Sequence, residues 1–228
     1  MRACFSRELL KSAGLITTGG QDFFRNRLLF PLHSLSGRVV GFAGRRLGDA
    51  SGVPKYLNSA GSELYVKSRF LFGLHLAKAA MRRAGGCYLT EGYTDVIAMQ
   101  QTGFKNTVGT GGTALTVEQI ALLRRFTKNV TLLFDGDAAG KKAVLRSLDL
   151  LLEQGMNAKV VYLPAGEDPA DFLLKRDANR MREYLEHETK DLLLSEIDNR
   201  FAEASGQPQQ LTTVTHDLTE ICAKIEDV

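Results

Sequence analysis

The stretch "TLLFDGDAAG", residues 131–140, joins an apolar run typical of a buried strand to two aspartates and then to a helical pattern. Residues i and i+2 of an extended segment point to the same side, and Gly136 lets the backbone turn without steric cost. Two carboxylates about 6 Å apart, at an effective dielectric of about 20, repel by on the order of 3 kcal/mol, and a divalent cation would relieve that repulsion. Asp-Gly-Asp is also a common turn tripeptide, so Asp135 and Asp137 alone leave a simple turn open.

The same order of apolar run and helical pattern occurs four times along the chain. "CYLT" leads to "TDVIAMQQTG", "NTVGT" to "TVEQIALLRRFT", "NVTLLF" to "AAGKKAVLRSLDLLLEQG", and "AKVVYLP" to "DPADFLLKR". Thr116 and Gln119 fit a capping box at the start of the second helix. Four such βα units predict an α/β fold with a mainly parallel sheet flanked by helices.

The flanking segments differ from this pattern. From Arg27, "RLLFPLHSLSGRVVGFAGRRLGD" alternates apolar runs with turn signals and predicts antiparallel strands. A helical pattern from about residue 70 ends on the glycine pair 85–86, and the pattern is helical again from about residue 177. We therefore predict a basic mixed α/β subdomain over 1–85, a catalytic α/β subdomain over 86–174 and a helical subdomain over 175–228.

Acidic residues stand where the apolar runs stop: Glu91 after the first, Asp135 and Asp137 after the third, and Asp168 just beyond the fourth. The carboxyl ends of parallel strands meet at one edge of a sheet, so these side chains are expected to converge. Ligands that are all oxygen favour Mg²⁺ or Mn²⁺. Taken singly, Glu91 can be a surface residue, Asp95 a favourable charge in the first turn of a helix, and Asp168 the start of a helix.

The glycine-rich segment "VGTGGTAL", residues 108–115, lacks the Gly-Lys-Ser/Thr ending that grips phosphates in a P-loop. It is interpreted as a tight strand-to-helix connection that also approaches the site closely.

Composition and charge divide the chain. No apolar run among the 228 residues approaches the roughly 20 needed to span a bilayer, which favours a cytoplasmic protein. Three cysteines without C-x-x-C spacing predict neither a disulfide framework nor a zinc site. The first 85 residues carry 14 Lys+Arg against 4 Asp+Glu. Cations that suit phosphates are interleaved there with an aromatic and an amide side chain that suit bases. The candidates for binding nucleic acid are Arg25, Arg27, Arg45, Lys55, Tyr56, Asn58 and Lys67. The alternative interpretation of these residues is a basic face that only contacts solvent.

Longer motifs add a resemblance. "EGYTDVIAMQQTG", "FDGDAAGKKA" and "LPAGEDPADFL" resemble the three acidic motifs of the Toprim domain. Upstream, "RNRLLFPLHSLSGRVVGFAGRRLGD", "PKYLNSA" and "KSRFLFGL" resemble the polymerase domain of bacterial DnaG-type primases, and the match runs from about residue 13 to 174.

This resemblance implies an RNA-polymerising nucleotidyltransferase. It implies synthesis of short RNA primers on a single-stranded DNA template for replication, from ribonucleoside triphosphates with Mg²⁺ or Mn²⁺. It also implies a monomer in the replisome, with a replicative helicase as partner through a domain absent from this chain. The implied catalytic residues are Glu91, Asp95, Asp135 and Asp137, and the implied metal ligands are Glu91, Asp135, Asp137 and Asp168. Whether Glu91 is a base or a ligand stays open. Of the residues named above, the resemblance implies that Arg45, Lys55, Tyr56, Asn58 and Lys67 hold template and nucleotide.

The chain departs from the family pattern in its last motif. The family usually has Asp-Pro-Asp, whereas here the order is Asp168-Pro169-Ala170-Asp171, so the second carboxylate is either displaced to Asp171 or missing. The zinc-binding domain expected upstream is absent and the first subdomain looks truncated, as in an excised catalytic core. Three other functions are alternatives to that of a primase. A Toprim topoisomerase needs a nucleophilic tyrosine on a further domain, and a recombination mediator would bring a zinc-binding cysteine cluster, so neither matches this sequence well. A Toprim nuclease would use similar acidic residues and is the alternative that an assay on DNA with Mg²⁺ distinguishes.

Overall fold

The computed structural model describes residues 5–48, 52–134, 138–204 and 208–223. By its contacts the chain forms two compact units, Met1–Phe70 and Leu71–Val228. Each unit has its own sheet and its own buried core, and each is described by itself.

The first unit is built on a three-stranded antiparallel sheet in the order β1-β2-β3. Its strands are β1 (Arg27–His33), β2 (Val39–Arg46) and β3 (Tyr56–Asn58), and the short helices are α1 (Arg7–Ser12) and η1 (Lys67–Arg69). The Ser6 hydroxyl caps α1 by accepting a hydrogen bond from the Leu9 amide at 3.2 Å. The prediction of antiparallel strands from Arg27 onward is confirmed.

The second unit contains a five-stranded sheet in the order β5-β4-β6-β7-β8. Four strands are parallel: β4 (Cys87–Thr90), β5 (Thr107–Gly109), β6 (Asn129–Phe134) and β7 (Asn157–Tyr162). The predicted mainly parallel sheet is confirmed. An antiparallel edge strand of two residues, β8 (Lys190–Asp191), was not predicted, because two residues carry no alternation signal.

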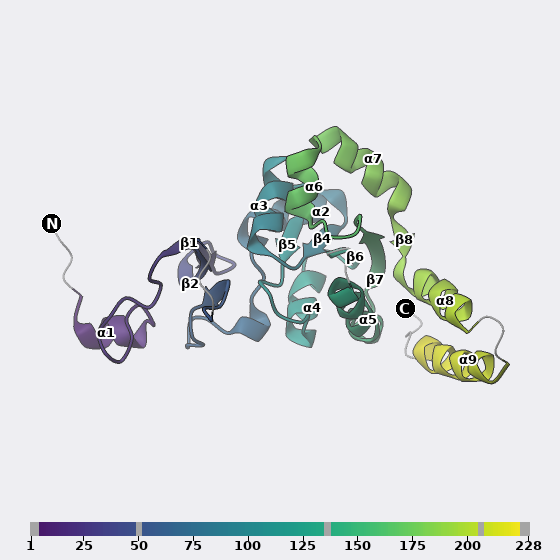
Figure 1. Ribbon diagram of the computed structural model, residues 1–228, viewed down its shortest axis with the longest axis horizontal. Helices are drawn as coiled ribbons and strands as arrows, with labels where there is room; N and C mark the ends of the chain where they lie inside the picture. Colours follow the sequence, from purple (N-terminus) through teal and green to yellow (C-terminus); the bar gives the residue numbers. More distant parts are fainter. Residues whose placement is uncertain (1–4, 49–51, 135–137, 205–207, 224–228) are drawn as a thin grey trace. The chain divides into compact units, whose positions relative to one another are not determined.

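Helices cover both faces of this sheet (Figure 1). On one face lie α3 (Tyr93–Gln101) and α6 (Pro169–Lys175); on the other lie α4 (Val117–Arg124) and α5 (Ala138–Glu153). The predicted capping box is confirmed, since the Thr116 hydroxyl accepts from the Gln119 amide and the Gln119 side chain accepts from the Thr116 amide. Between sheet and helices lies a buried core that includes Met99, Leu133 and Phe172.

The compact units divide after Phe70 and not at the predicted subdomain boundary of residues 85–86. Phe72 forms a backbone bridge with Gly109 of β5, with N···O distances of 2.8 and 3.1 Å. The next helix, α2 (Leu74–Ala84), packs against β5 and buries Leu74, Ala77 and Met81. Because this apolar face is satisfied by the parallel sheet, the helix belongs to the second unit. Helix α2 ends at its C-cap Gly85, whose φ of +64° is the left-handed conformation expected of a glycine at the end of a helix, so the predicted helix end is confirmed.

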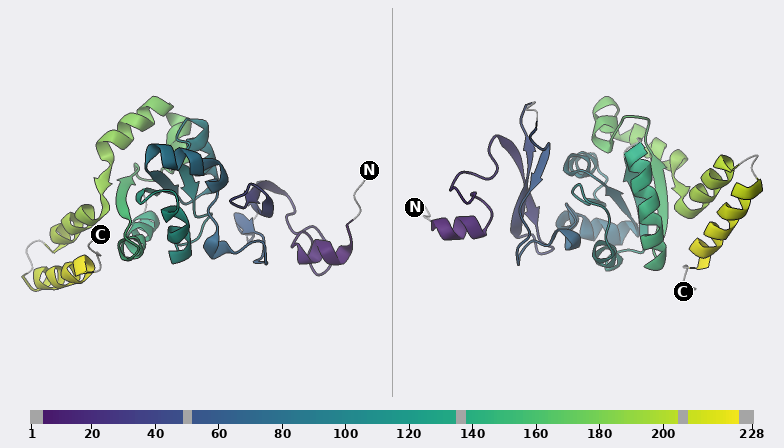
Figure 2. Two further views of the ribbon diagram at one scale, coloured as in Figure 1. Left: turned by 180° about the vertical axis from the view of Figure 1, so that it is seen from behind. Right: turned by 60° about the horizontal axis from the view of Figure 1, so that its bottom comes forward.

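The C-terminal region is helical, as predicted, but belongs to the second unit rather than to a separate one. It comprises α7 (Ala178–Glu188), α8 (Leu192–Glu203) and α9 (Pro208–Ala223). Figure 2 shows α8 and α9 side by side, and Arg200 on α8 lies 3.7 Å from Asp217 on α9. In the described part of the chain, no helix combines the length and the apolar character that crossing a membrane requires.

Candidate active site

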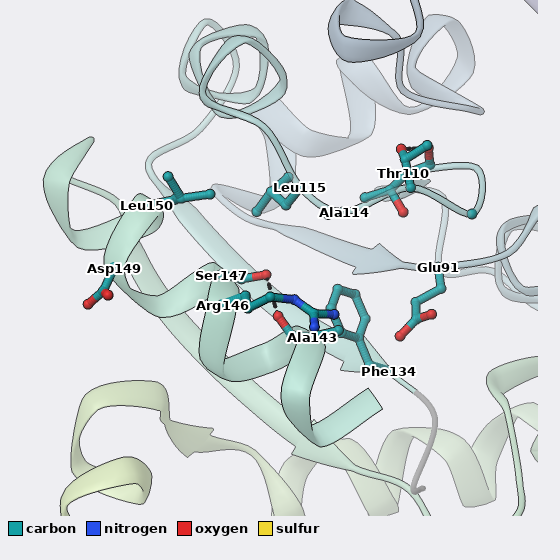
Figure 3. Close-up of a pocket in the computed structure, with 12 residues that line it drawn as sticks. Glu91, Thr110, Ala114, Leu115, Phe134, Ala143, Arg146, Ser147, Asp149 and Leu150 are labelled. Carbon is teal, nitrogen blue, oxygen red and sulfur yellow. Dashed lines mark hydrogen bonds between the residues drawn. The ribbon is translucent and has the colours of Figure 1, made fainter. Parts of the chain in front are cut away.

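Glu91 directly follows β4 and lines a pocket of about 630 Å³ at the carboxyl end of the parallel strands. Figure 3 shows its carboxylate directed into the pocket near Phe134, the last residue of β6. Arg146 extends from α5 into the same space, and Thr110 and Thr113 line it from the β5–α4 connection. Ser147 and Asp149 of α5 also line it, so the pocket combines two acidic, one basic and three hydroxyl side chains with apolar residues such as Phe134.

The glycine-rich connection fixes the backbone of Glu91. The Gly112 amide donates to the Glu91 carbonyl at 3.0 Å, and the Thr110 amide donates to the Thr90 carbonyl at 3.1 Å. Tyr93, at the start of α3, donates its hydroxyl to the Gly111 carbonyl at 3.2 Å. The close approach of this segment to the site is therefore confirmed.

Asp95 lies in the first turn of α3 and is buried. Its Oδ2 accepts a hydrogen bond from the Gly92 amide at 2.9 Å. This bond ties the start of the helix to the residue next to Glu91, which is the helix-start role that the sequence offered as the alternative to a catalytic one.

Asp168 caps the helix α6 that follows β7. Its Oδ1 accepts from the Asp171 amide at 2.6 Å, and Pro169 takes the first helical position. Asp171 therefore contacts Asp168 through the backbone amide of Asp171. The carboxylate of Asp171 belongs to the first turn of α6. Glu167, one residue earlier, forms ion pairs with Lys175 at 2.9 Å and Arg176 at 2.6 Å. Hydrogen bonds from these cations hold the pKa of Glu167 below its usual value.

Asp135 and Asp137, the centre of the predicted acidic cluster, lie outside the described residues. Among the residues that the structure does describe, no group of three His, Cys, Asp or Glu side chains is close enough to hold a metal ion. The donors supplied by Glu91 and Asp168 are carboxylate oxygens, the type that Mg²⁺ and Mn²⁺ take. The donor chemistry of the described residues thus fits such an ion.

The basic residues predicted for nucleic acid divide into two groups. Strand register places Arg45 opposite Tyr56, and Asn58 two residues further on, so all three share one face of the first sheet. Arg27 instead holds the backbone together, since its guanidinium donates to the carbonyls of Gly44, Pro54 and Lys55 at 3.0 to 3.3 Å. These hydrogen bonds give Arg27 a structural role, and its contact with nucleic acid stays a prediction. The remaining predicted cations are exposed: Arg25, Lys55 and Lys67.

Sequence reasoning did not identify Arg146. Its position follows from α5, which carries it two turns beyond the start of the helix and into the pocket that Glu91 lines. A basic residue at that spacing after "FDGD" was the available signal, but one cation in an amphipathic helix is more often a solvated side chain.

Comparison with known proteins assigns both units. Residues 88–173 match the Toprim-like family model, and residues 1–78 match the N-terminal domain of the DNA primase catalytic core. A crystal structure of a DNA primase domain from Pseudomonas aeruginosa superposes with a TM-score of 0.88 at 32% identity, covering 96% of this chain and 70% of that one. The chain belongs to the DnaG primase family.

Further relatives agree with this family. A DnaG primase catalytic domain bound to single-stranded DNA matches with a TM-score of 0.84 at 30% identity, over 96% of this chain and 72% of that chain. The DNA primase of Staphylococcus epidermidis is 40% identical over 195 residues, which is 83% of this chain and 32% of the relative. The chain thus spans about a third of the length of that curated primase. The fold is the mixed α/β fold of DnaG catalytic cores.

Proposed function

We propose that this chain is the catalytic core of a primase that synthesises short RNA primers on single-stranded DNA. The observation that carries the proposal is the pocket at the carboxyl edge of the sheet, whose lining includes both Glu91 and Arg146. Family membership supports it, because the matched structures are DNA primase domains over 96% of this chain. The substrates are ribonucleoside triphosphates, and the setting is the replisome in the cytoplasm, with a replicative helicase as partner and the core acting as a monomer.

Each described residue has a role that follows from its position. The Glu91 carboxylate points into the pocket, and its proposed role is to accept the proton of an attacking 3′-hydroxyl or to ligate a cation. The Arg146 guanidinium is suited to triphosphate oxygens, which it binds as a fixed fork of donors. Asp95 and the Thr110–Gly112 segment hold the backbone around Glu91, as their hydrogen bonds to Gly92, Thr90 and Glu91 indicate.

The proposed site for Mg²⁺ or Mn²⁺ consists of Glu91, Asp135, Asp137 and Asp168. A divalent ion held by these residues would neutralise charge on the triphosphate. The residues of this chain supply the oxygen donors and the fixed strand ends that carry them. Arg25, Arg45, Lys55, Tyr56, Asn58 and Lys67 are proposed to contact template and nucleotide.

The test offers the chain single-stranded DNA, labelled ribonucleotides and Mn²⁺, and compares it with Asp135→Ala and Glu91→Gln. RNA synthesis should fall by on the order of a hundredfold or more in either variant. Glu183→Ala, at an exposed ion pair on α7, is the control that should retain synthesis. Equal RNA yields from the wild type and Asp135→Ala would show that the assignment is wrong.

A second measurement separates loss of chemistry from loss of metal. Mn²⁺ binding followed by electron paramagnetic resonance should weaken in Asp135→Ala. If Glu91 is the base and not a ligand, Glu91→Gln should retain Mn²⁺ affinity while losing synthesis. If it is a ligand, the two losses should occur together.

A further inference from the structure

Six basic residues gather at the opposite edge of the parallel sheet from Glu91. Strands β4, β5 and β6 are parallel and adjacent, so the segments that lead into them meet at one edge. These segments, residues 82–86, 102–106 and 124–128, contain six cations and no acidic residue. We call this set the strand-start patch: Arg82, Arg83, Lys105, Arg124, Arg125 and Lys128.

Hydrogen bonds join the three segments. The Thr127 hydroxyl donates to the Gly85 carbonyl at 2.8 Å, and the Asn129 amide side chain donates to the same carbonyl at 2.7 Å. On the other side, Asn106 donates to the Gly86 carbonyl at 2.9 Å. The backbone that carries the six cations is therefore ordered, so a ligand would not have to bring them together.

Aromatic contacts hold two of the guanidinium groups. Arg82 lies 5.0 Å and Arg125 lies 6.0 Å from the centre of the Phe126 ring. All six cations of the strand-start patch are exposed, and none forms an ion pair with a carboxylate within the described chain. Glu186 on α7 is a nearby acidic residue, since burial and then the charge of Glu186 raise the pKa of Tyr88 on β4.

The concentration of positive charge is local. Residues 71–228 contain 18 Lys+Arg against 22 Asp+Glu, so the unit is otherwise net acidic. The described large apolar side chains that are exposed all lie outside the three segments. A protein interface of ordinary kind would need an apolar centre, whereas a phosphate backbone requires cations on an ordered surface.

We propose that the strand-start patch binds the phosphate backbone of nucleic acid. Four of its six members are arginines, whose planar fork matches phosphate oxygens, and the stacked pair on Phe126 presents its donors in fixed positions. The patch lies at the edge away from the pocket of Glu91, so it serves binding rather than chemistry. The inference stands apart from the proposed primase activity, since it needs only a polyanionic strand.

The test measures binding of a labelled single-stranded oligonucleotide to the full chain by fluorescence anisotropy at several salt concentrations. The variant Arg82→Glu/Arg125→Glu should bind about tenfold more weakly at low salt. Its slope of log affinity against log salt should fall by about 0.7 for each phosphate that the variant no longer neutralises. The matched control, Arg180→Glu/Lys190→Glu, makes the same change in net charge at exposed positions on α7 and β8 and should retain the slope.

A second variant guards against misfolding. Lys105→Glu/Lys128→Glu leaves the arginines on Phe126 in place and should also weaken binding, with an unchanged circular dichroism spectrum. Photo-crosslinking should mark peptides that contain residues 82–83 or 124–128. Wild-type affinity and salt slope in both variants would overturn the proposal. Binding of polyglutamate to the same variants is measured in parallel. Variants that lose polyglutamate binding but retain oligonucleotide binding would also overturn the proposal, because the ligand would then be an acidic polypeptide.

Discussion

Glu167 and Arg176 are joined at 2.6 Å between Oε2 and Nη1, and this pair ties the turn before Asp168 to the end of the helix that Asp168 starts. The Glu167 amide also donates to the Pro164 carbonyl at 3.0 Å, which closes the turn. Arg176 in turn lies 4.3 Å from the centre of the buried Phe172 ring. The residue adjacent to a proposed metal ligand is therefore fixed at both its backbone and its side chain.

Glu167→Ala should lower both the Tm and the affinity for Mn²⁺. The hydrogen bonds from Arg176 and Lys175 lower the pKa of Glu167, so the stabilisation is present above the carboxyl group's unfolded pKa and is lost as the pH falls through the lowered one. Wild type and variant should therefore differ in Tm at neutral pH and converge in acid. Calorimetric unfolding across this pH range and Mn²⁺ titration measure the two effects.

The Arg180–Glu183 pair provides the control for this prediction. It has the same kind of contact, 2.9 Å, but both side chains are more than half exposed. Exposed pairs contribute about 0–1 kcal/mol, so Glu183→Ala should leave the Tm and Mn²⁺ affinity nearly unchanged. Equal effects of the two substitutions would mean that Glu167 does not position the turn.

Gly111→Ala should be more damaging than Gly112→Ala, although the residues are adjacent. Both have positive φ, +72° and +76°, a region that costs an L residue about 1–3 kcal/mol. Only at Gly111 would the new Cβ also lie 2.8 Å from the Tyr93 hydroxyl oxygen, and at Gly112 nothing lies within 4 Å. Denaturant unfolding should show the difference, and primer synthesis should fall more in Gly111→Ala because that segment holds Glu91.

Local patterns sufficed for the elements of the parallel sheet. The capping box at Thr116 and the glycine at 85 act within one turn of chain, so they are legible in the sequence and present in the structure. The convergence of Glu91 and Asp168 at strand ends was predicted from parallel topology alone and stays a prediction. The sequence did not predict that α2 packs on the parallel sheet, because the bridge from Phe72 to Gly109 joins residues far apart in sequence.

The roles of individual cations were also beyond sequence reasoning. Arg27 and Arg45 stand in the same basic segment, yet one caps three backbone carbonyls and the other lies opposite Tyr56 in the sheet. In the composition, Arg27 and Arg45 are both simply positive charges. The structure distinguishes them because the Pro54 and Lys55 carbonyls lie within hydrogen-bond distance of the Arg27 guanidinium.

Arg27→Ala and Arg45→Ala should therefore have opposite consequences. Loss of the Arg27 hydrogen bonds should cost about 1–2 kcal/mol of stability, with a secondary loss of DNA binding only as the unit unfolds. Arg45→Ala should keep the Tm and reduce the salt dependence of single-stranded DNA binding by about 0.7 in the logarithmic slope. Tm shifts and anisotropy titrations distinguish the two, and a reversed pattern would return Arg27 to the binding surface.

Cys87 should resist thiol reagents until the second unit opens. It is the first residue of β4 and is buried, and burial raises the pKa of its thiol to about 12, so roughly one molecule in ten thousand is thiolate at pH 8. In a Cys4→Ser/Cys222→Ser background, labelling should be slow in buffer and complete in denaturant. Because the unfolded thiol releases its proton near pH 8.5, stability should fall as the pH rises beyond that value, and labelling through opening should accelerate. Rapid labelling at pH 8 without denaturant would place Cys87 at the surface and contradict the register of β4 against β6.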